Sequence, residues 1–308
     1  MAKKLSKREI RYMVAFNEKE SYLLMPNNIF DILPQDEELM DAKAPHVAIA
    51  YTYIYFITWL YRYAKYGVMD LENVTDKRIK YILGLAETNK EINYIIKKNG
   101  VLDRLGITKT VSFLEAPVEW YFWGEDTSHP EWIYFKEKND SLKVIDKSIN
   151  VKRKQIKEPL FAINTREVND TEYNGTFYDK EYTHQIPFEV FVECMINPEL
   201  GCTAFYIYGY LASRCGTNSG QIQVSVETIS KRTGVRHTTR DKALDALKKF
   251  GLIGCFPENF VVERGEYKTE ANTYWVHKDA ERFTTEPINY PKRNVIHRLH
   301  LQDNKEEN

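Results

Sequence analysis

The sequence predicts an α+β protein with two similar units, each built from a helix-turn-helix followed by a two-stranded hairpin. Three observations support this prediction. Residues 224–256 have the pattern of two short helices around a glycine turn, followed by a strand. A second strand pattern, Asn272 to Val276, returns after a polar loop over residues 257–271. Several features of this half also occur in the first half, in the same order.

The first half is expected to begin with extended segments and to be organised around one long helix. The extended segments are Ile10 to Phe16 and Tyr22 to Met25. The helix runs from Val47 to Tyr66 and is apolar on nearly every side, which is typical of a helix at the centre of a core. Its uncharged part is about fifteen residues long, which is too short to span a bilayer.

Two more helices and a hairpin should follow this long helix. Thr75 can cap a helix that buries Ile79 and Ile82. The next helix is expected from about Thr88 to Gly100. Its outward-facing polar residues include Lys90, Asn93 and Lys97. Residues 110–135 alternate between apolar and polar side chains and are rich in aromatic residues, which predicts the hairpin.

The second helix-turn-helix has recognisable ends. Ser225 is a natural N-cap for a helix that starts at Val226. Gly234 supplies the positive φ that a tight turn between helices often requires. The next helix begins near His237, and Gly251 follows its end as a C′ residue.

The N-terminal end of this last helix is predicted to be an exposed, basic surface. Counting residues 224–256 gives seven basic and three acidic residues, so the balance is 7 − 3 = +4, although the whole chain has a formal charge of −1. Residues 161–200 hold two basic and eight acidic residues, which gives 2 − 8 = −6. Local positive charge on a neutral chain favours a site-specific nucleic-acid binder over one that coats nucleic acid indiscriminately.

The internal repeat is the strongest sign of how the chain is organised. MPNNIFD at Met25 matches IPFEVFV at Ile186, and YTYIYFITWL matches AFYIYGYL. Three residue pairs are separated by the same 151 positions: Tyr55 and Tyr206, Leu60 and Leu211, and Gly100 and Gly251. We therefore predict four regions: a first unit over 1–138, a linker over 139–182, a second unit over 183–278, and a partly disordered tail over 279–308. The linker contains a basic run, residues 151–157, which is either a solvated segment or an arm that touches phosphate.

The pattern ETISKRTGVRHTTRDKALDALKKFGLI, with its hairpin, resembles the winged-helix DNA-binding family over about a quarter of the chain. The tandem arrangement, and the I-P-x-x-x-F segment before YIYGYL, resemble plasmid and phage replication initiators of Gram-positive bacteria. The resemblance implies double-stranded DNA as partner, recognition of origin repeats, a homodimer, and contacts with host replication proteins. The first unit departs from the pattern, because LGLAETNKE replaces the Gly-Val-Arg turn and its helix is less basic.

In that family the second helix enters the major groove, which implies specific roles here. Arg236 and Arg240 become candidates for guanine contact, and Thr238 and Thr239 for phosphate or a thymine methyl. The remaining candidates of the second unit are His237 on the same helix, three cations expected at the DNA backbone, Lys231, Arg232 and Lys242, and two wing residues expected at the minor groove, Arg264 and Lys268. Lys90, Asn93 and Lys97 are the weaker candidates of the first unit.

Enzymatic chemistry is not expected. The sequence contains no G-x-x-x-x-G-K-[ST], no G-x-G-x-x-G and no H-E-x-x-H motif, and His297 and His300 have no clear metal-binding partner. The four cysteines lack zinc spacing and are expected to be buried thiols in a reducing compartment. We expect no cofactor, no metal, no membrane association and a cytoplasmic location.

Two other functions fit the same sequence. The first is a transcriptional regulator whose N-terminal unit dimerises or senses a ligand. The second is a scaffold of the replication machinery in which both units bind proteins and the basic surfaces are incidental.

Overall fold

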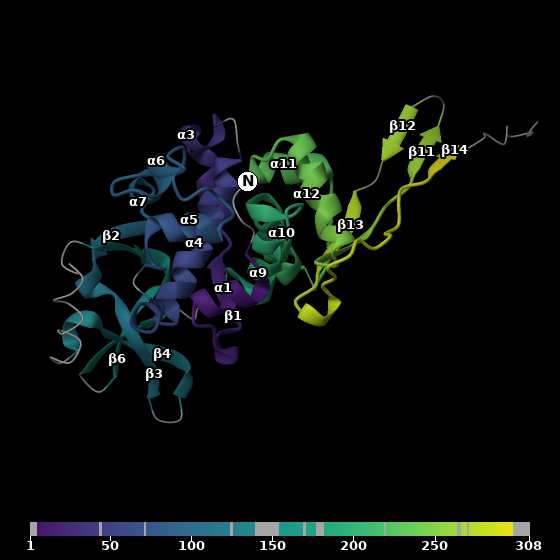
Figure 1. Cartoon of the computed structure of the whole chain (residues 1–308). Coiled ribbons are helices and arrows are strands. Elements are labelled where there is room, and N and C mark those ends of the chain that lie inside the picture. Colours follow the sequence, from purple (N-terminus) through teal and green to yellow (C-terminus); the bar gives the residue numbers. More distant parts are fainter. Residues whose placement is uncertain are drawn as a thin grey trace, which may run out of the picture.

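The structure is a computed structural model, and it places helices and small, mostly antiparallel sheets in one α+β fold (Figure 1). It describes residues 5–42, 45–70, 72–123, 126–138, 154–168, 171–176, 182–218, 220–263, 266–269 and 271–297. Among the described residues, no helix is both long and apolar enough to cross a membrane.

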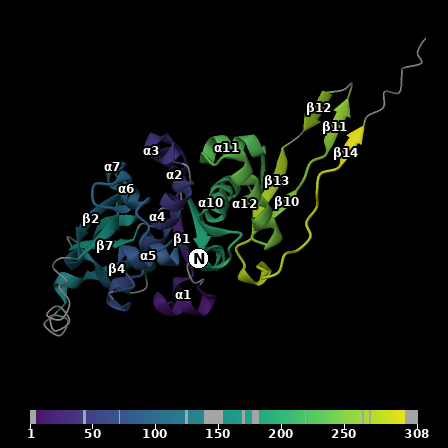
Figure 2. The same cartoon turned by 45° about the horizontal axis from the view of Figure 1, so that its top comes forward.

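Two 17-residue helices, one from each half, form the centre of the core. They are α4 (His46–Arg62) and α10 (Gly201–Thr217), and they lie next to each other in Figures 1 and 2. Every residue of α4 is buried, as the sequence predicted. Aromatic rings fill the contact: Tyr51 lies 5.3 Å from Tyr206, and Tyr55 lies 4.9 Å from Phe205, between ring centroids. The wealth of aromatic residues therefore serves packing between the two halves.

Gly209 allows α4 and α10 to approach each other, because a β-carbon there would lie 2.3 Å from the Tyr51 hydroxyl oxygen. Tyr51 is held in place by a 2.8 Å hydrogen bond to His184. We predict that Gly209→Ala lowers the free energy of unfolding by about 2 kcal/mol, since added volume in a packed core forces a shift. Gly216→Ala, on the same helix but with no neighbouring atom within 4 Å, is the matched control and should be neutral or slightly stabilising. Equal denaturation midpoints for the two variants would contradict this.

The repeated sequence segments pair directly with each other. Strand β1 (Tyr22–Pro26) runs antiparallel to β8 (Thr183–Pro187), and Leu24 faces Gln185 at the centre of the register. These two residues occupy equivalent positions in the repeat, 161 apart like Met25 and Ile186, so the pair is locally symmetric. Each strand is followed by a short apolar helix, α2 (Ile29–Ile32) or α9 (Phe188–Ile196).

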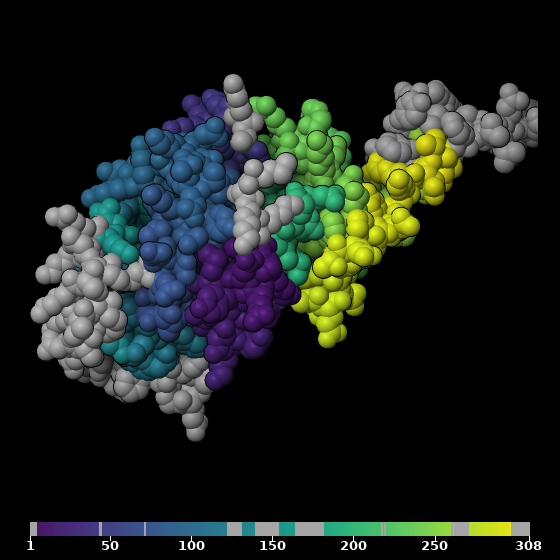
Figure 3. Space-filling view, viewed as in Figure 1, coloured from purple at the N-terminus to yellow at the C-terminus, as the bar shows by residue number. Residues whose placement is uncertain are grey.

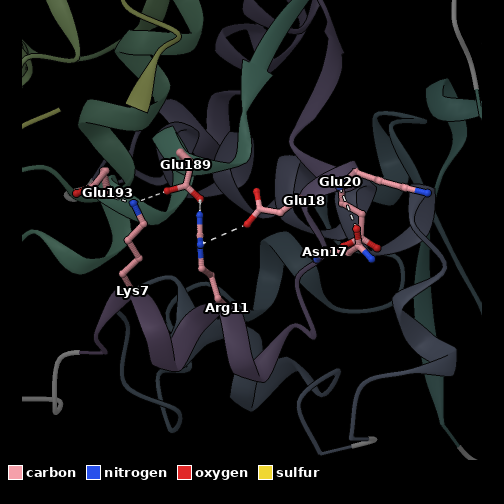
Figure 4. A network of polar contacts seen from close by, with 8 residues as sticks. Lys7, Arg11, Asn17, Glu18, Glu20, Glu189 and Glu193 are labelled. Carbon is pink, nitrogen blue, oxygen red and sulfur yellow. Dashed lines mark hydrogen bonds and ion pairs between the residues drawn. The ribbon is translucent and has the colours of Figure 1, made fainter. Parts of the chain in front are cut away.

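The N-terminus is helical, so the prediction of an extended segment over Ile10 to Phe16 was wrong. Helix α1 (Lys7–Met13) begins with a capping box, in which Ser6 accepts from the N–H of Glu9 and Glu9 accepts from the N–H of Ser6. Figure 4 shows how α1 binds the second half. Lys7 contacts Glu193 at 3.3 Å and also Glu189, which accepts a second bond from Arg11. The first helix thus ties the two halves together.

The region after α4 contains shorter helices than the sequence suggested. The cap at Thr75 is confirmed, and helix α5 follows it. The helix expected from Thr88 to Gly100 is reduced to the single turn α6, because Lys80 Nζ binds the carbonyl of Asn89 and Oδ1 of Asn93 at 2.6 Å each and holds this segment in turns. The elements after α4 are η3 (Lys65–Gly67), α5 (Asp76–Ile82), α6 (Asn93–Ile96) and α7 (Val101–Arg104), and η2 (Leu33–Gln35) and α3 (Glu37–Met40) precede α4.

The predicted linker contains strands that belong to the first half. Strand β5 pairs with β2, and β6 and β7 extend the β3–β4 hairpin into a sheet of order β3-β4-β7-β6. The predicted hairpin over 110–135 is therefore right for β3 and β4 only. The bounds are β2 (Thr108–Ser112), β3 (Pro117–Trp123), β4 (Asp126–Tyr134), β5 (Gln155–Pro159), β6 (Ile163–Val168) and β7 (Thr171–Thr176).

The end of the basic run is structural. Lys157 lies in β5, is 5% exposed, and its Nζ binds Asp103 Oδ1 at 2.6 Å. Burial opposes ionisation of Asp103, but hydrogen bonds from Lys157, Thr108 and Thr110 outweigh it, so the pKa of this carboxyl lies below its usual value. Lys157 is thus neither a solvated residue nor a phosphate contact. Residues 151–153 of the run lie outside the described residues.

The second half continues from α10 into two helices, a three-stranded sheet and a projecting ribbon. The sheet has the order β10-β13-β9, and the ribbon has the order β12-β11-β14. Two strands of the ribbon lie in the segment predicted to be a polar loop, and the third lies in the predicted tail. The bounds are β9 (Ile222–Val224), α11 (Val226–Thr233), α12 (His237–Lys249), β10 (Ile253–Phe256), β11 (Phe260–Glu263), β12 (Glu266–Thr269), β13 (Asn272–Val276) and β14 (Val295–His297).

Candidate nucleic-acid interface

The turn between α11 and α12 has the local structure that its sequence predicts. Ser225 Oγ accepts from the N–H of Thr228 at 3.1 Å and caps α11. Gly234 follows α11 with a φ of 71°, in the left-handed region. The Thr233 hydroxyl donates to the carbonyl of Ile229 at 2.7 Å and accepts from the N–H of Val235 at 3.3 Å. Side-chain and backbone bonds together fix the angle between the helices.

Gly234 is also needed because the turn packs closely against the first half. A β-carbon there would lie 2.4 Å from Met40 Cε, so the turn rests directly on the end of α3. Figure 2 shows α3 and α11 as neighbours. A small cavity between them, of about 40 Å³, is lined on one side by Leu39 and Met40 and on the other by Arg236 and Thr239. The start of α12 therefore borders the acidic α3 segment, whose Glu37 and Glu38 are exposed.

Arg240 is not part of the exposed surface, contrary to the sequence-based expectation. It is 5% exposed, and its guanidinium joins the two helices. Nη1 donates to the carbonyl of Val226 at 2.7 Å and to the hydroxyl of Ser230 at 2.9 Å, and Nε donates to Asp241 at 2.9 Å. Its donors point into the protein because the side chain turns back over α11. Arg240 fixes the relative position of α11 and α12.

The other second-unit candidates on α11 and α12 lie at the surface around the turn. Thr239 is half-buried, and the exposed members are Lys231, Arg232, Arg236, His237, Thr238 and Lys242. Arg232 forms an ion pair with Asp31 at 3.7 Å, and both side chains are more than half exposed. The structure thus gathers four cations, an imidazole and a hydroxyl on one region of the two helices.

A packed core supports this surface from behind. Ile229 of α11, Leu244 and Leu247 of α12, and Tyr274 of β13 are all buried in the same cluster. The predicted strands at 252–256 and 272–276 pair antiparallel, with Ile253 opposite Val276. The C′ glycine is also confirmed, since Gly251 has a φ of 71°. The two helices are therefore held on a sheet rather than exposed on a loop.

The wing candidates are only partly described. Lys268 lies in β12, where its backbone pairs with Val261 of β11. Arg264 lies outside the described residues. The strand that carries Lys268 belongs to the projecting ribbon in Figure 1 and not to the three-stranded sheet.

The first-unit candidates do not form an equivalent surface. Lys90 and Lys97 are exposed, but they flank the single-turn helix α6 instead of sharing one long helix. Asn93 is half-buried, and its Oδ1 accepts from Lys80 at 2.6 Å. The two units therefore differ at the position where a recognition helix would lie.

A polar cluster at the end of α12 was missed by the sequence analysis. Tyr290 donates to Asp245 at 2.9 Å, and Lys248 Nζ lies 4.2 Å from the Tyr290 ring centroid. Burial opposes ionisation of Asp245, but the bonds from Lys248 and Tyr290 outweigh it and lower the pKa of this carboxyl. The available signal was Tyr290 itself, an aromatic residue in the segment predicted to be a partly disordered tail.

No metal or redox site is found among the described residues. They contain no group of three or more His, Cys, Asp or Glu side chains arranged to hold a metal ion. All four cysteines are free; Cys194 and Cys215 are buried, and Cys202 and Cys255 are half-buried. Burial raises the pKa of Cys202 to about 11, so its thiol stays protonated at neutral pH.

Comparison of the chain with protein-family models, curated proteins and solved structures gave no match.

Proposed function

We propose that this chain binds double-stranded DNA sequence-specifically, with residues 201–276 forming a winged helix whose recognition helix is α12. The observation that supports the proposal most strongly is the exposed cationic surface around the α11–α12 turn, on helices fixed by Gly234 and Arg240. The element order α10, β9, α11, α12, β10, β13 also has the sequence of a winged helix. A helix start that carries Arg236 and two threonines suits a major groove.

Each candidate residue has a proposed role. Arg236, at the N-cap of α12, contacts guanine through two hydrogen bonds, and Thr238 and Thr239 contact phosphate or a thymine methyl. The backbone contacts come from Lys231, Arg232 and Lys242, with His237 beside them and the wing residues Arg264 and Lys268 at the minor groove. Arg240 acts indirectly, by holding α12 against α11.

The acidic α3 segment beside α12 supports selective binding. Leu39 and Met40 of this segment line the cavity at the start of α12, and the segment also carries the exposed carboxylate of Glu37, whereas Glu38 is paired with Arg104 at 2.6 Å. The negative charge of Glu37 should weaken non-specific attraction to phosphate. Only a DNA site whose bases make direct contacts with α12 then binds strongly enough to overcome this repulsion.

We further propose that the protein acts as a non-enzymatic replication initiator that recognises repeats at its origin and recruits host replication proteins. The support is the sequence resemblance, together with the repeat that pairs β1 with β8. The second unit provides most of the DNA affinity, since the first has only α6 and α7, of four residues each, where the second has α12. The first unit then acts mainly as the partner that positions the second.

Two substitutions on neighbouring elements test the residue roles. Arg236→Ala should weaken binding to the preferred site by about 1–3 kcal/mol and relax the preference at one base pair. Lys231→Ala should weaken binding to all sequences alike and reduce the salt slope by about one. Affinities for matched and mismatched duplexes over a salt series measure both effects. If the two variants behaved identically on every duplex, the assignment of base and phosphate contacts would be wrong.

A further inference from the structure

The three-stranded ribbon projects away from the body of the molecule in Figures 1 and 2, and in Figure 3 the yellow C-terminal segment extends away from the body in the same direction. Its strands are β12, β11 and β14, in that order across the sheet. Strand β14 comes from the end of the described chain and pairs parallel to β11, with Ile296 opposite Val261. Small sheets without a packed face are only marginally stable alone.

The segment that leads to β14 is attached to the body by hydrogen bonds along its length. The N–H of Thr284 donates to the carbonyl of Phe250 at 3.1 Å, and that of Ile288 donates to the carbonyl of Lys249 at 2.9 Å. The Tyr290–Asp245 bond and a 2.7 Å bond from Arg293 Nη2 to Asn272 Oδ1 follow. These bonds hold the segment before β14 against the body and position β14 beside β11.

Strand β14 is apolar and exposed. Val295 and Ile296 are 57% and 43% exposed, although neighbouring residues of a strand point to opposite faces. Ile288 and Phe256, on the approach to the ribbon, are 49% and 61% exposed. Four of the nine large hydrophobic residues exposed in the described chain therefore lie in or next to this arm, which indicates a surface that another molecule covers.

The two edges of the ribbon differ in chemistry. Edge strand β12 carries Glu266 and Lys268, and charges of this kind protect an edge against pairing with another chain. Edge strand β14 has the sequence Val-Ile-His, without a formal charge at neutral histidine. Within the described residues β14 pairs only with β11. Among the described residues its other edge is open, and the strand carries no formal charge that would protect it.

We propose that this open edge pairs with β14 of a second copy of the chain, so that two arms join into one continuous sheet. An antiparallel register centred on Ile296 places Ile296 opposite its equivalent and Val295 opposite His297. Within the three residues of β14, no like charges face each other in this register. The edge is thus self-complementary, as a two-fold symmetric interface requires. This proposal does not depend on DNA binding.

The oligomeric state of the full chain over a concentration series tests the proposal. Wild type should approach twice the chain mass in light scattering. Ile296→Lys should weaken self-association by about a hundredfold, because the substitution places two like charges opposite each other where the two isoleucines pair. Thr269→Lys, which adds the same charge to edge strand β12, is the matched control and should dimerise like wild type. Unchanged far-UV circular dichroism confirms that each variant is folded.

Cross-linking gives an independent readout. Ile296→Cys should form an intermolecular disulfide when an oxidant is added, since the two thiols face each other across the symmetry axis, while Thr269→Cys should not. A wild type that stays monomeric at every concentration would overturn the proposal. So would a dimer that Ile296→Lys leaves intact or that both lysine variants disrupt equally.

Discussion

Replacing Arg240 with alanine is expected to destabilise the protein by about 3 kcal/mol, because the substitution removes charge-assisted hydrogen bonds from a buried site. The guanidinium bonds to the Val226 carbonyl and to the Ser230 hydroxyl are both lost, and the side-chain volume between α11 and α12 is left unfilled. DNA affinity should fall as well, for every sequence, since α12 is no longer held in position. Chemical denaturation followed by circular dichroism measures the first effect.

Lys242→Ala is the matched control for this prediction. Lys242 lies two residues further along α12 and is exposed, so its loss should change stability by no more than about 0.5 kcal/mol. An Arg240→Ala protein with wild-type stability and altered base preference would show that Arg240 contacts DNA bases and does not act through the fold.

Acidification is the second change with a large expected effect, and it acts through His184. This imidazole is buried between the halves, where Tyr51 donates to Nε2 at 2.8 Å and Nδ1 donates to Asn27 Oδ1 at 2.9 Å. Asn27 Oδ1 can only accept, which assigns the ring proton to Nδ1. Burial, and to a smaller extent the charge of Lys278, lower the pKa of His184 to about 3.

The lowered pKa of His184 means that the folded protein loses stability as the pH falls. The unfolded chain binds a proton near the ordinary pKa, 6.5, whereas the folded chain does not until about pH 3. The contribution of the neutral His184 ring to the free energy of unfolding is therefore fully present above pH 6.5. It is lost as the pH falls toward 3, at about 1.4 kcal/mol per pH unit. Relative to neutral pH, the loss should reach about 2 kcal/mol at pH 5.

A variant without the titrating ring isolates this contribution. His184→Gln should show a flatter dependence of unfolding free energy on pH between 7 and 5, whereas His237→Gln, at an exposed position, should follow wild type. Burial raises the pKa of Glu20 and of Asp76, so protonation of these two carboxyls favours the folded state as the pH falls. The effect of His184 is therefore measured as the difference in unfolding free energy between wild type and His184→Gln. If the unfolding free energies of wild type and His184→Gln changed equally with pH, His184 would not be the group responsible.

Local signals predicted the two helices of the helix-turn-helix and their ends, but not the ribbon of β11, β12 and β14. Ser225, Gly234 and Gly251 each have one dominant structural use, and each was found in the conformation expected of it. The long apolar helix was also predictable, since a helix that is apolar on all sides needs protein on all sides, although it ends at Arg62 and not at Tyr66 as predicted. Helix α1 could have been found as well, because Ser6 and Glu9 have capping-box spacing.

What the sequence could not reveal depends on contacts between distant residues. Spacing placed Arg240 beside Arg236, but only its contacts with α11 show that its donors are used inside the protein. Lys157 was read as part of a charged run, and its partner, Asp103, is more than fifty residues away. The helix over 88–100 failed for the same reason, because the bonds from Lys80 favour turns over local helix propensity.

The measurement that tests the central claim most directly is binding of the purified chain to fragments tiled across its own gene and flanking DNA, at two salt concentrations. The proposal predicts tight binding to one fragment that carries direct repeats, with most of the affinity retained at the higher salt concentration. A palindrome at the promoter, without repeats, would favour the transcriptional regulator over the initiator. Uniformly weak binding that disappears with salt would contradict sequence-specific recognition, because it leaves only attraction to phosphate.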